Sequence, residues 1–246
     1  MKIIIVGGVA GGASCGARLR RLDEKAEILM VERGPYVSYA NCGLPYHVGG
    51  VIQKESSLLV ASEQLFREQF AIDVRTGCEA IEIASKEKKV SLRDVKTGEV
   101  TEHSYDKLVL SPGAVSVRPP LPGIDLPGIF HVRTVPDARQ INEWLERGSA
   151  FLTGMDQYSG FQTIKPETRA VVVGGGFIGL EMAENLVHRG FEVTLVEMSD
   201  QVLPPCGRGK CARCRGPPPA AWCPPRAQRR SRGVQADCIG RDRCAD

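Results

Sequence analysis

Two glycine-rich segments of the same kind constrain the fold of this chain more than any other feature. Residues 2–6 form a short β-branched run that leads into glycines from residue 7 onward, and residues 170–173 lead in the same way into glycines from residue 174. Each segment is followed by a helix-forming stretch and then by a further apolar run, over residues 26–31 and 192–196. This order predicts two βαβ units and therefore an α/β fold.

The second glycine segment has the spacing of a dinucleotide-binding turn. Gly174, Gly176 and Gly179 form the pattern GxGxxG between a strand and a helix, and Glu197 ends the next strand. Such glycines allow a tight turn, close approach of the backbone to a pyrophosphate and packing of the helix on the strand, while the acidic residue accepts a hydrogen bond from a ribose hydroxyl. The two residues after Glu197 carry no positive charge for a 2′-phosphate, so NADH is favoured over NADPH.

The first glycine segment departs from this spacing at one position, because Val9 stands where the second glycine belongs. Four glycines remain as candidate cofactor contacts: Gly7, Gly8, Gly11 and Gly12. Glu32 ends the next strand at the distance expected for a ribose-binding carboxylate. A glycine-rich turn without a ligand is the alternative interpretation. The similar unit downstream favours a second Rossmann-type dinucleotide site.

Two dinucleotide sites in one chain indicate electron transfer between two cofactors, one of which is usually a flavin. Cys42 is the candidate acceptor of the electrons. Because proline is tolerated only in the first turn of a helix, a helix containing Pro45 would place Cys42 at its N-terminus, where the helix dipole favours the thiolate. A small buried structural cysteine is the alternative, but the polar and glycine neighbours argue against it. With no partner cysteine a few residues away, the oxidised form must be a mixed disulfide or a sulfenic acid.

Weaker signals organise the rest of the chain. Alternating apolar residues over residues 77–101 predict an antiparallel β-meander, and residues 62–69 predict a helix capped by Ser62. The proline-rich residues 118–128 suit a crossing between domains. A helix is predicted over residues 136–147, and residues 149–168, which show no clear period, are predicted to form a surface loop.

The segments at residues 7–22, 38–46, 105–120 and 171–185 resemble the FAD-dependent pyridine nucleotide-disulfide oxidoreductases, and most closely their coenzyme A-disulfide reductase branch. The resemblance covers about residues 1–205, and residues 38–46, with Cys42 inside Asn-Cys-Gly-Leu-Pro-Tyr, form its most specific part. It implies that a hydride passes from NAD(P)H at the second unit to FAD at the first, and then to a Cys42–coenzyme A mixed disulfide. The alternatives are an NADH oxidase or peroxidase that uses a Cys42 sulfenate, and a catalytically inactive dinucleotide-binding fragment. The natural acceptor stays open among CoA disulfide, a persulfide, a peroxide and oxygen.

The resemblance also assigns further residues. Those matching its coenzyme A contacts are Ser14, Arg18, Arg21, Ser38 and Asn41. Those matching its flavin contacts, besides the first glycine turn and Glu32, are Arg33, Ser111 and Gly113. Glu181 falls where the family often has a carboxylate near the nicotinamide, although an exposed helical glutamate explains it equally well. His47 is interpreted as a loop histidine.

The last 41 residues differ sharply from the rest in composition. From Cys206 onward there are nine Arg, one Lys and three Asp, a net charge of +7, so the first 205 residues carry −4 of the overall +3. One CxxC pair, Cys211 and Cys214, lacks the second ligand pair that structural zinc normally needs, so no metal site is predicted. Because 25 of these 41 residues are Arg, Gly, Ala or Pro, a frame-shifted readout is the preferred interpretation.

Three domains are therefore expected. Residues 1–118 form the N-terminal part of an FAD-binding domain, residues 119–205 form an incomplete NAD(P)-binding domain, and residues 206–246 form an Arg/Pro/Cys-rich tail that is non-native or disordered. Full-length members of the family are expected to be homodimers, and this chain is expected to lack their dimerisation domain. The mildly acidic body excludes nucleic acid as a partner, and the lack of a long apolar run predicts a cytoplasmic protein without membrane contact.

Overall fold

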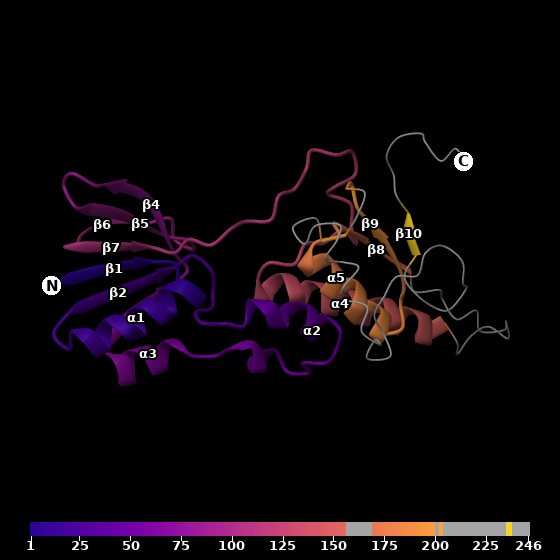
Figure 1. The fold of residues 1–246 in the computed structure, drawn as a ribbon, viewed down its shortest axis with the longest axis horizontal. Helices are drawn as coiled ribbons and strands as arrows, with labels where there is room; N and C mark the ends of the chain where they lie inside the picture. Colours follow the sequence, from indigo (N-terminus) through magenta and orange to yellow (C-terminus); the bar gives the residue numbers. More distant parts are fainter. Residues whose placement is uncertain (156–168, 200–201, 204–234, 238–246) are drawn as a thin grey trace. The chain divides into compact units, whose positions relative to one another are not determined.

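The computed structural model describes residues 1–155, 169–199, 202–203 and 235–237. These residues fall into two units (Figure 1). The first contains Met1–Asn41 and Lys54–Asp125, and the second contains Cys42–Gln53 together with residues from Leu126 onward. The segment around Cys42 therefore groups with the second unit, although it lies within the first by sequence. The division of the chain into cofactor domains at residue 118 stays a prediction.

The first unit is built on a parallel sheet of four strands in the order β3-β2-β1-β7. The strands are β1 (Lys2–Val6), β2 (Glu27–Glu32), β3 (Ile72–Thr76) and β7 (Lys107–Leu110). The central residues Ile3, Ile4 and Ile5 of β1 are at most 2% exposed. This continuous burial is typical of a parallel sheet covered on both faces, and it explains the uninterrupted β-branched run in the sequence.

Helices cover one face of this sheet and an antiparallel meander covers the other (Figure 1). Ala13 of α1 (Ala10–Leu22) and Phe66 of α3 (Glu63–Phe70) pack in one core cluster with Ile5. Val90 and Leu92 of the meander pack in a second cluster with residues from the other face of β1 and β2. The meander consists of β4 (Cys78–Ala84), β5 (Lys89–Asp94) and β6 (Val100–Ser104), as the alternating pattern predicted.

The second unit contains a parallel sheet in the order β10-β9-β8, with α5 (Phe177–His188) connecting the first two of its strands in the chain. The strands are β8 (Arg169–Val173), β9 (Glu192–Val196) and β10 (Gln235–Asp237). Two further helices belong to this unit, the short α2 (Leu44–Val48) and α4 (Val135–Met155). The predicted α/β fold with two Rossmann-type units and an antiparallel meander is confirmed.

Two regions differ from the sequence prediction or extend beyond it. Helix α4 continues to Met155, so the first part of the predicted surface loop at 149–168 is helical; Ala150, Leu152 and Met155 are strong helix formers. Within the tail, residues 235–237 form β10 and pair in parallel with β9. The remaining predictions for the tail, including its zinc-like cysteines, lie outside the described residues.

Two findings bear on function classes. None of the helices in the described part of the chain has both the length and the apolar character that a bilayer crossing requires. Within those same residues, His, Cys, Asp and Glu side chains form no group of three or more that could hold a metal ion.

Candidate functional site

The first glycine turn is fixed by very close backbone contacts. Gly7 has a φ of +95°, and its N–H donates to the carbonyl of Val31 at 2.8 Å. A Cβ added to Gly7 would lie 2.0 Å from the carbonyl oxygen of Ser111, and one added to Gly12 would lie 1.7 Å from that of Gly7. Only glycine fits these two positions, because the atoms in the way belong to the backbone.

The carboxylate of Glu32 is tied to this turn. Its Oε2 accepts a hydrogen bond from the Gly8 N–H at 2.8 Å, and its Oε1 accepts one from the Gly34 N–H at 2.8 Å. An ionised carboxylate has about four lone-pair sites, so each oxygen can still accept a further bond. Glu32 can therefore hold the turn and bind a ribose hydroxyl at the same time. The sequence predicted the ribose contact but not the bonds to the turn.

The second glycine turn repeats this geometry. The Gly174 N–H donates to the carbonyl of Val196 at 2.8 Å, and a Cβ on Gly179 would lie 1.8 Å from the carbonyl oxygen of Gly174. Glu197 accepts hydrogen bonds from the backbone N–H groups of Ser199 and Gly175. These bonds, with that from Ser199 the largest cause, lower the pKa of Glu197 below its ordinary value. The carboxylate is therefore ionised throughout the neutral range.

The similarity extends to the loop that follows β2 in the first unit and to the loop that follows β9 in the second. The Ser38 N–H donates to the carbonyl of Gly8 at 2.9 Å, and the Leu203 N–H donates to the carbonyl of Gly175 at 2.8 Å. Both donors have a positive φ, 46° at Ser38 and 52° at Leu203. Ser38 was assigned from the sequence as a substrate contact; its backbone also supports the turn. No shared residue type marks the two positions, so sequence reasoning missed their equivalence.

Both turns leave a helix N-terminus without a side-chain cap. The N-cap residues are Val9 for α1 and Gly176 for α5, and neither side chain makes a capping hydrogen bond. A Cβ built on Gly176 would meet no atom of the described residues within 4 Å. Uncapped N–H groups at the positive end of a helix dipole suit an anion such as a pyrophosphate. The open space at Gly176 fits the close approach of such a ligand.

One face of α1 carries the side chains predicted to contact coenzyme A. Ser14, Arg18 and Arg21 are all exposed, and their spacing of four and three residues places them on one side of the helix. Within the described residues, Arg18 and Arg21 have no ion-pair partner. The neighbouring Arg20 instead donates to the carbonyls of Phe70 and other residues, which makes its role structural.

The other predicted flavin contacts lie beside the first turn or on the surface. The Ser111 N–H donates to the carbonyl of Val6 at 2.7 Å, which brings the end of β7 to the turn. Gly113 follows with a φ of 69°. Arg33 is 60% exposed and lies 3.6 Å from Glu79 in an ion pair, so its guanidinium has a protein partner that the sequence did not reveal.

Cys42 is exposed, whereas the three residues that follow it are buried. It lies in the 3-10 turn Asn41–Gly43, directly before α2, so the predicted position at the start of a helix agrees with the structure. The other two cysteines of the described residues, Cys15 and Cys78, are partly buried. Burial raises the pKa of the Cys78 thiol, which disfavours its thiolate. Among the described residues, exposure thus singles out Cys42 as the accessible thiol.

Two residues near these positions have surroundings that the sequence did not determine. His47 is 8% exposed and lies within α2, where its Nδ1 is 2.7 Å from the carbonyl oxygen of Ile52. The interpretation as a loop histidine is therefore wrong; the buried ring helps to close the turn after α2. Glu181 lies on α5 and is partly buried.

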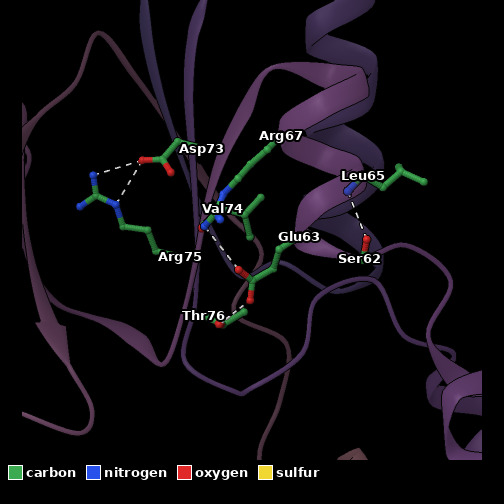
Figure 2. A network of polar contacts seen from close by, with 8 residues as sticks. All are labelled: Ser62, Glu63, Leu65, Arg67, Asp73, Val74, Arg75 and Thr76. Atoms are coloured by element: carbon green, nitrogen blue, oxygen red, sulfur yellow. Dashed lines mark hydrogen bonds and ion pairs between the residues drawn. The ribbon is translucent and has the colours of Figure 1, made fainter.

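A cavity of about 370 Å³ lies elsewhere in the first unit, between α3 and the strands β3 to β6. Figure 2 shows polar contacts from its wall: Arg67 donates to the carbonyl of Val74 at 2.6 Å, and the Thr76 hydroxyl donates to Glu63 at 2.6 Å. None of the residues assigned from the sequence lines it. It therefore adds nothing to the candidate site.

Comparison with known proteins agrees with this geometry. The family model described as pyridine nucleotide-disulphide oxidoreductase matches residues 1–214. The coenzyme A disulfide reductase of Staphylococcus haemolyticus is 38% identical over 201 residues, which are 82% of this chain and 41% of that protein. The chain thus spans about two fifths of the length of this relative.

Two solved structures are similar. Reduced Bacillus anthracis CoADR-RHD is 40% identical with a TM-score of 0.78, and the match covers 96% of this chain and 38% of that one. An NAD-dependent persulfide reductase from A. fulgidus is 38% identical with a TM-score of 0.72, covering 83% of this chain and 35% of that one.

Proposed function

Because this chain belongs to the pyridine nucleotide-disulphide oxidoreductase family, we propose that it transfers electrons from NAD(P)H through FAD to Cys42, which reduces a coenzyme A disulfide. The observation that carries this proposal is the presence, among the described residues, of two matched, uncapped glycine turns and one exposed cysteine. The two dinucleotide sites would bind an electron donor and a flavin that relays the electrons, and the thiol would accept them.

FAD is assigned to the first turn and NAD(P)H to the second. The uncapped start of α1 and the carboxylate of Glu32 would hold the pyrophosphate and a ribose hydroxyl of FAD. The uncapped start of α5 and Glu197 would do the same for NADH. FAD, when bound, supplies a group that accepts a hydride and passes an electron pair to sulfur.

Cys42 then acts as the nucleophile. Its thiolate attacks one sulfur of CoA disulfide, a Cys42–coenzyme A disulfide bond forms, and one coenzyme A thiolate leaves. The hydride from NADH and one proton from solvent supply the two electrons and two hydrogens that convert this mixed disulfide to the Cys42 thiol and a second coenzyme A thiol. NAD⁺ is the other product, so atoms and electrons balance.

The substrate class is proposed from the relatives and from α1. The relative from S. haemolyticus is a coenzyme A disulfide reductase by name, and Arg18 and Arg21 offer two exposed guanidinium groups without protein partners among the described residues. Guanidinium groups are well suited to phosphates such as those of coenzyme A. Ser14, Ser38 and Asn41 complete the proposed coenzyme A contacts.

A persulfide is the second candidate substrate, because the A. fulgidus protein at 38% identity is an NAD-dependent persulfide reductase. The Cys42 thiolate would attack the sulfane sulfur, form a Cys42 persulfide and release the thiolate of the substrate, so the two candidates differ in substrate and not in the reactive residue. Peroxide and oxygen are the remaining acceptors to compare.

The experiment follows the two half-reactions separately. The full chain is supplied with FAD, mixed anaerobically with NADH, and then mixed with CoA disulfide, a persulfide, peroxide or oxygen while the flavin absorbance is recorded. Cys42→Ser should keep the NADH-dependent loss of absorbance and lose its return with CoA disulfide. Cys15→Ser and Cys78→Ser are the matched controls. The proposal fails if either control loses the second phase while Cys42→Ser keeps it.

A further inference from the structure

The segment that presents Cys42 is held by its far end. After Cys42, residues 43–49 are buried except for the half-buried Tyr46, and α2 ends at Val48. The last carbonyl groups of a helix lack partners inside the helix, so they must find donors elsewhere. How they are satisfied decides how firmly this short helix is fixed.

Backbone donors from the following turn serve three of these carbonyls. The carbonyl of Pro45 accepts from the Gly49 N–H at 2.8 Å, and that of His47 accepts from the Gly50 N–H at 3.1 Å. The carbonyl of Tyr46 accepts from the N–H groups of residues 51 and 52. The carbonyl of Val48 instead accepts from the Nη1 of Arg189 at 2.7 Å. This donor comes from a residue 141 positions away in the sequence.

Arg189 is itself held in place at the end of α5. Its Nη1 also donates to the Oδ1 of Asn142 at 2.7 Å, and the Nδ2 of Asn142 lies 3.4 Å from the carbonyl oxygen of His47. Two helices, α4 and α5, thus each supply one side chain to the end of α2. We call Arg189 and Asn142 the α2 clamp.

The backbone of the turn also packs tightly against α5. A Cβ added to Gly49 would lie 2.4 Å from the Oδ1 of Asn185, which is only 3% exposed. The Nδ2 of Asn185 donates to the carbonyl of Glu181 at 2.8 Å, so the amide has little freedom to move aside. The end of α2 is therefore located by one close contact and by the α2 clamp.

We propose that Arg189 is a positioning residue for Cys42: by holding the end of α2, it fixes the orientation in which the exposed thiol meets a disulfide. This inference rests on the proposed role of Cys42 as nucleophile. Reactions of this kind depend on alignment, and a displacement of about 1 Å can lower a rate about a hundred-fold. A loosened α2 should consequently slow the attack without weakening substrate binding.

Arg20 offers a matched control. It too is an arginine whose guanidinium donates to backbone carbonyls at the end of a helix, those of Phe70, the last residue of α3, and Ala71, at 2.7 and 2.8 Å. It belongs to the first unit, and within the described residues its hydrogen bonds go to backbone carbonyls of that unit. Arg20→Ala should thus remove equivalent bonds at a different helix.

The first measurement is amide hydrogen exchange on the full chain. Arg189→Ala should speed exchange at residues 49–52 about ten-fold or more, since bonds to charged donors are stronger than ordinary hydrogen bonds, and leave residues 70–71 unchanged. Arg20→Ala should speed exchange at residues 70–71 and leave residues 49–52 unchanged. Unchanged exchange at residues 49–52 in Arg189→Ala overturns the inference, whether or not Cys42 reacts with disulfides.

The second measurement is the rate of Cys42–coenzyme A disulfide formation at increasing CoA disulfide, followed by the mass of the Cys42 peptide. Arg189→Ala should lower the maximal rate about ten-fold with the same half-saturation, Arg189→Lys should recover part of the loss because it restores one donor, and Arg20→Ala should match the wild type. Equal losses in Arg189→Ala and Arg20→Ala would indicate general destabilisation and overturn the inference. If the wild type did not form the adduct, the proposed function would be contradicted. Hydrogen exchange at residues 49–52 would then test by itself whether the α2 clamp holds the end of α2.

Asn142→Ala guards against a variant that does not fold. Its longer contact of 3.4 Å to the carbonyl of His47 makes its loss milder, so it should show the same two effects at smaller size. Far-UV circular dichroism of all four variants accompanies both measurements. A normal rate in a folded Asn142→Ala and a folded Arg189→Ala would also contradict the inference.

Discussion

The two glycine turns are nearly identical, but the strands that lead into them are packed very differently. In the first unit β1 lies between β2 and β7, and Ile4 and Ile5 are 0% exposed. In the second unit β8 pairs with β9, and Val171 and Val173 are 65% and 81% exposed in the described part of the chain. The turn geometry is the same in both surroundings.

The equivalent positions show where the difference comes from. Ile4 and Val171 both lie three residues before the first glycine of their turns. Ile4 is covered by Val90 and Leu92 of the meander, whereas the described part of the second unit contains no such layer. We conclude that the glycines and the strand-end glutamate set the turn locally, and that distant segments determine the burial of the strand.

The largest expected effect comes from Gly12→Ala in the first turn. The new Cβ would lie 1.7 Å from the carbonyl oxygen of Gly7, so the backbone would have to move. Overpacking of this kind costs typically about 1–3 kcal/mol and more where the backbone is the obstacle, so the first unit should unfold or lose FAD binding. Thermal unfolding and FAD titration measure this. If Gly12→Ala retained both, the turn would not be as rigid as its geometry implies.

Gly176→Ala should affect binding and leave folding unchanged. The added methyl group would meet no described atom within 4 Å, so thermal stability should stay the same within error. It would occupy the space proposed for the pyrophosphate, and NADH affinity should fall about ten-fold or more because the backbone could no longer approach the ligand. Calorimetric titration with NADH measures the affinity. Unchanged affinity would place the dinucleotide elsewhere.

Glu197→Gln should remove the preference for NADH over NADPH. The wild-type carboxylate would accept from a ribose 2′-hydroxyl and repel a 2′-phosphate, and the amide would do neither in full, so the affinity ratio should fall about ten-fold. In the wild type, the pKa of Glu197 lies below the ordinary glutamate value. The preference for NADH should therefore persist when the pH falls to the ordinary glutamate pKa, and it should be lost only at lower pH. Titration of both nucleotides between pH 7 and pH 4 tests this. A wild type that prefers NADPH would contradict the assignment.

Ser62→Ala should have the smallest effect. Helix α3 differs from the two turn helices because the Ser62 hydroxyl accepts from the Leu65 N–H at 3.1 Å and caps it (Figure 2). Loss of such a cap costs about 1 kcal/mol, so the unfolding temperature should fall slightly while FAD and NADH affinities stay the same. A change in either affinity would mean that α3 influences the dinucleotide sites.

Local signals made much of this fold and site predictable. The glycine turns, the glutamates that end β2 and β9, and the Ser62 cap each depend on residues close together in the sequence or at a fixed spacing. Their residue types are dictated by backbone geometry, as the contact between Gly12 and Gly7 illustrates. The alternating pattern of the meander follows from one buried and one exposed face.

Contacts between distant segments were not predictable. The bond from Arg189 to Val48 joins residues 141 positions apart, and neither residue type signals it. The same holds for the grouping of Cys42–Gln53 with the second unit, and for the burial of His47 in α2. The bonds of Glu32 and Glu197 to their own turns also needed the structure, because a carboxylate at the end of a strand can equally well point to solvent.

The most direct test of the electron path from NADH to Cys42 starts from the mixed disulfide. The full chain is loaded with coenzyme A at Cys42 by treatment with CoA disulfide, supplied with FAD, and mixed anaerobically with NADH, while released coenzyme A thiol and oxidised NADH are counted. We predict one coenzyme A thiol released per NADH oxidised, and no release without FAD. Release at the same rate without FAD, or oxidation of NADH by the loaded chain with coenzyme A still attached to Cys42, would contradict this prediction.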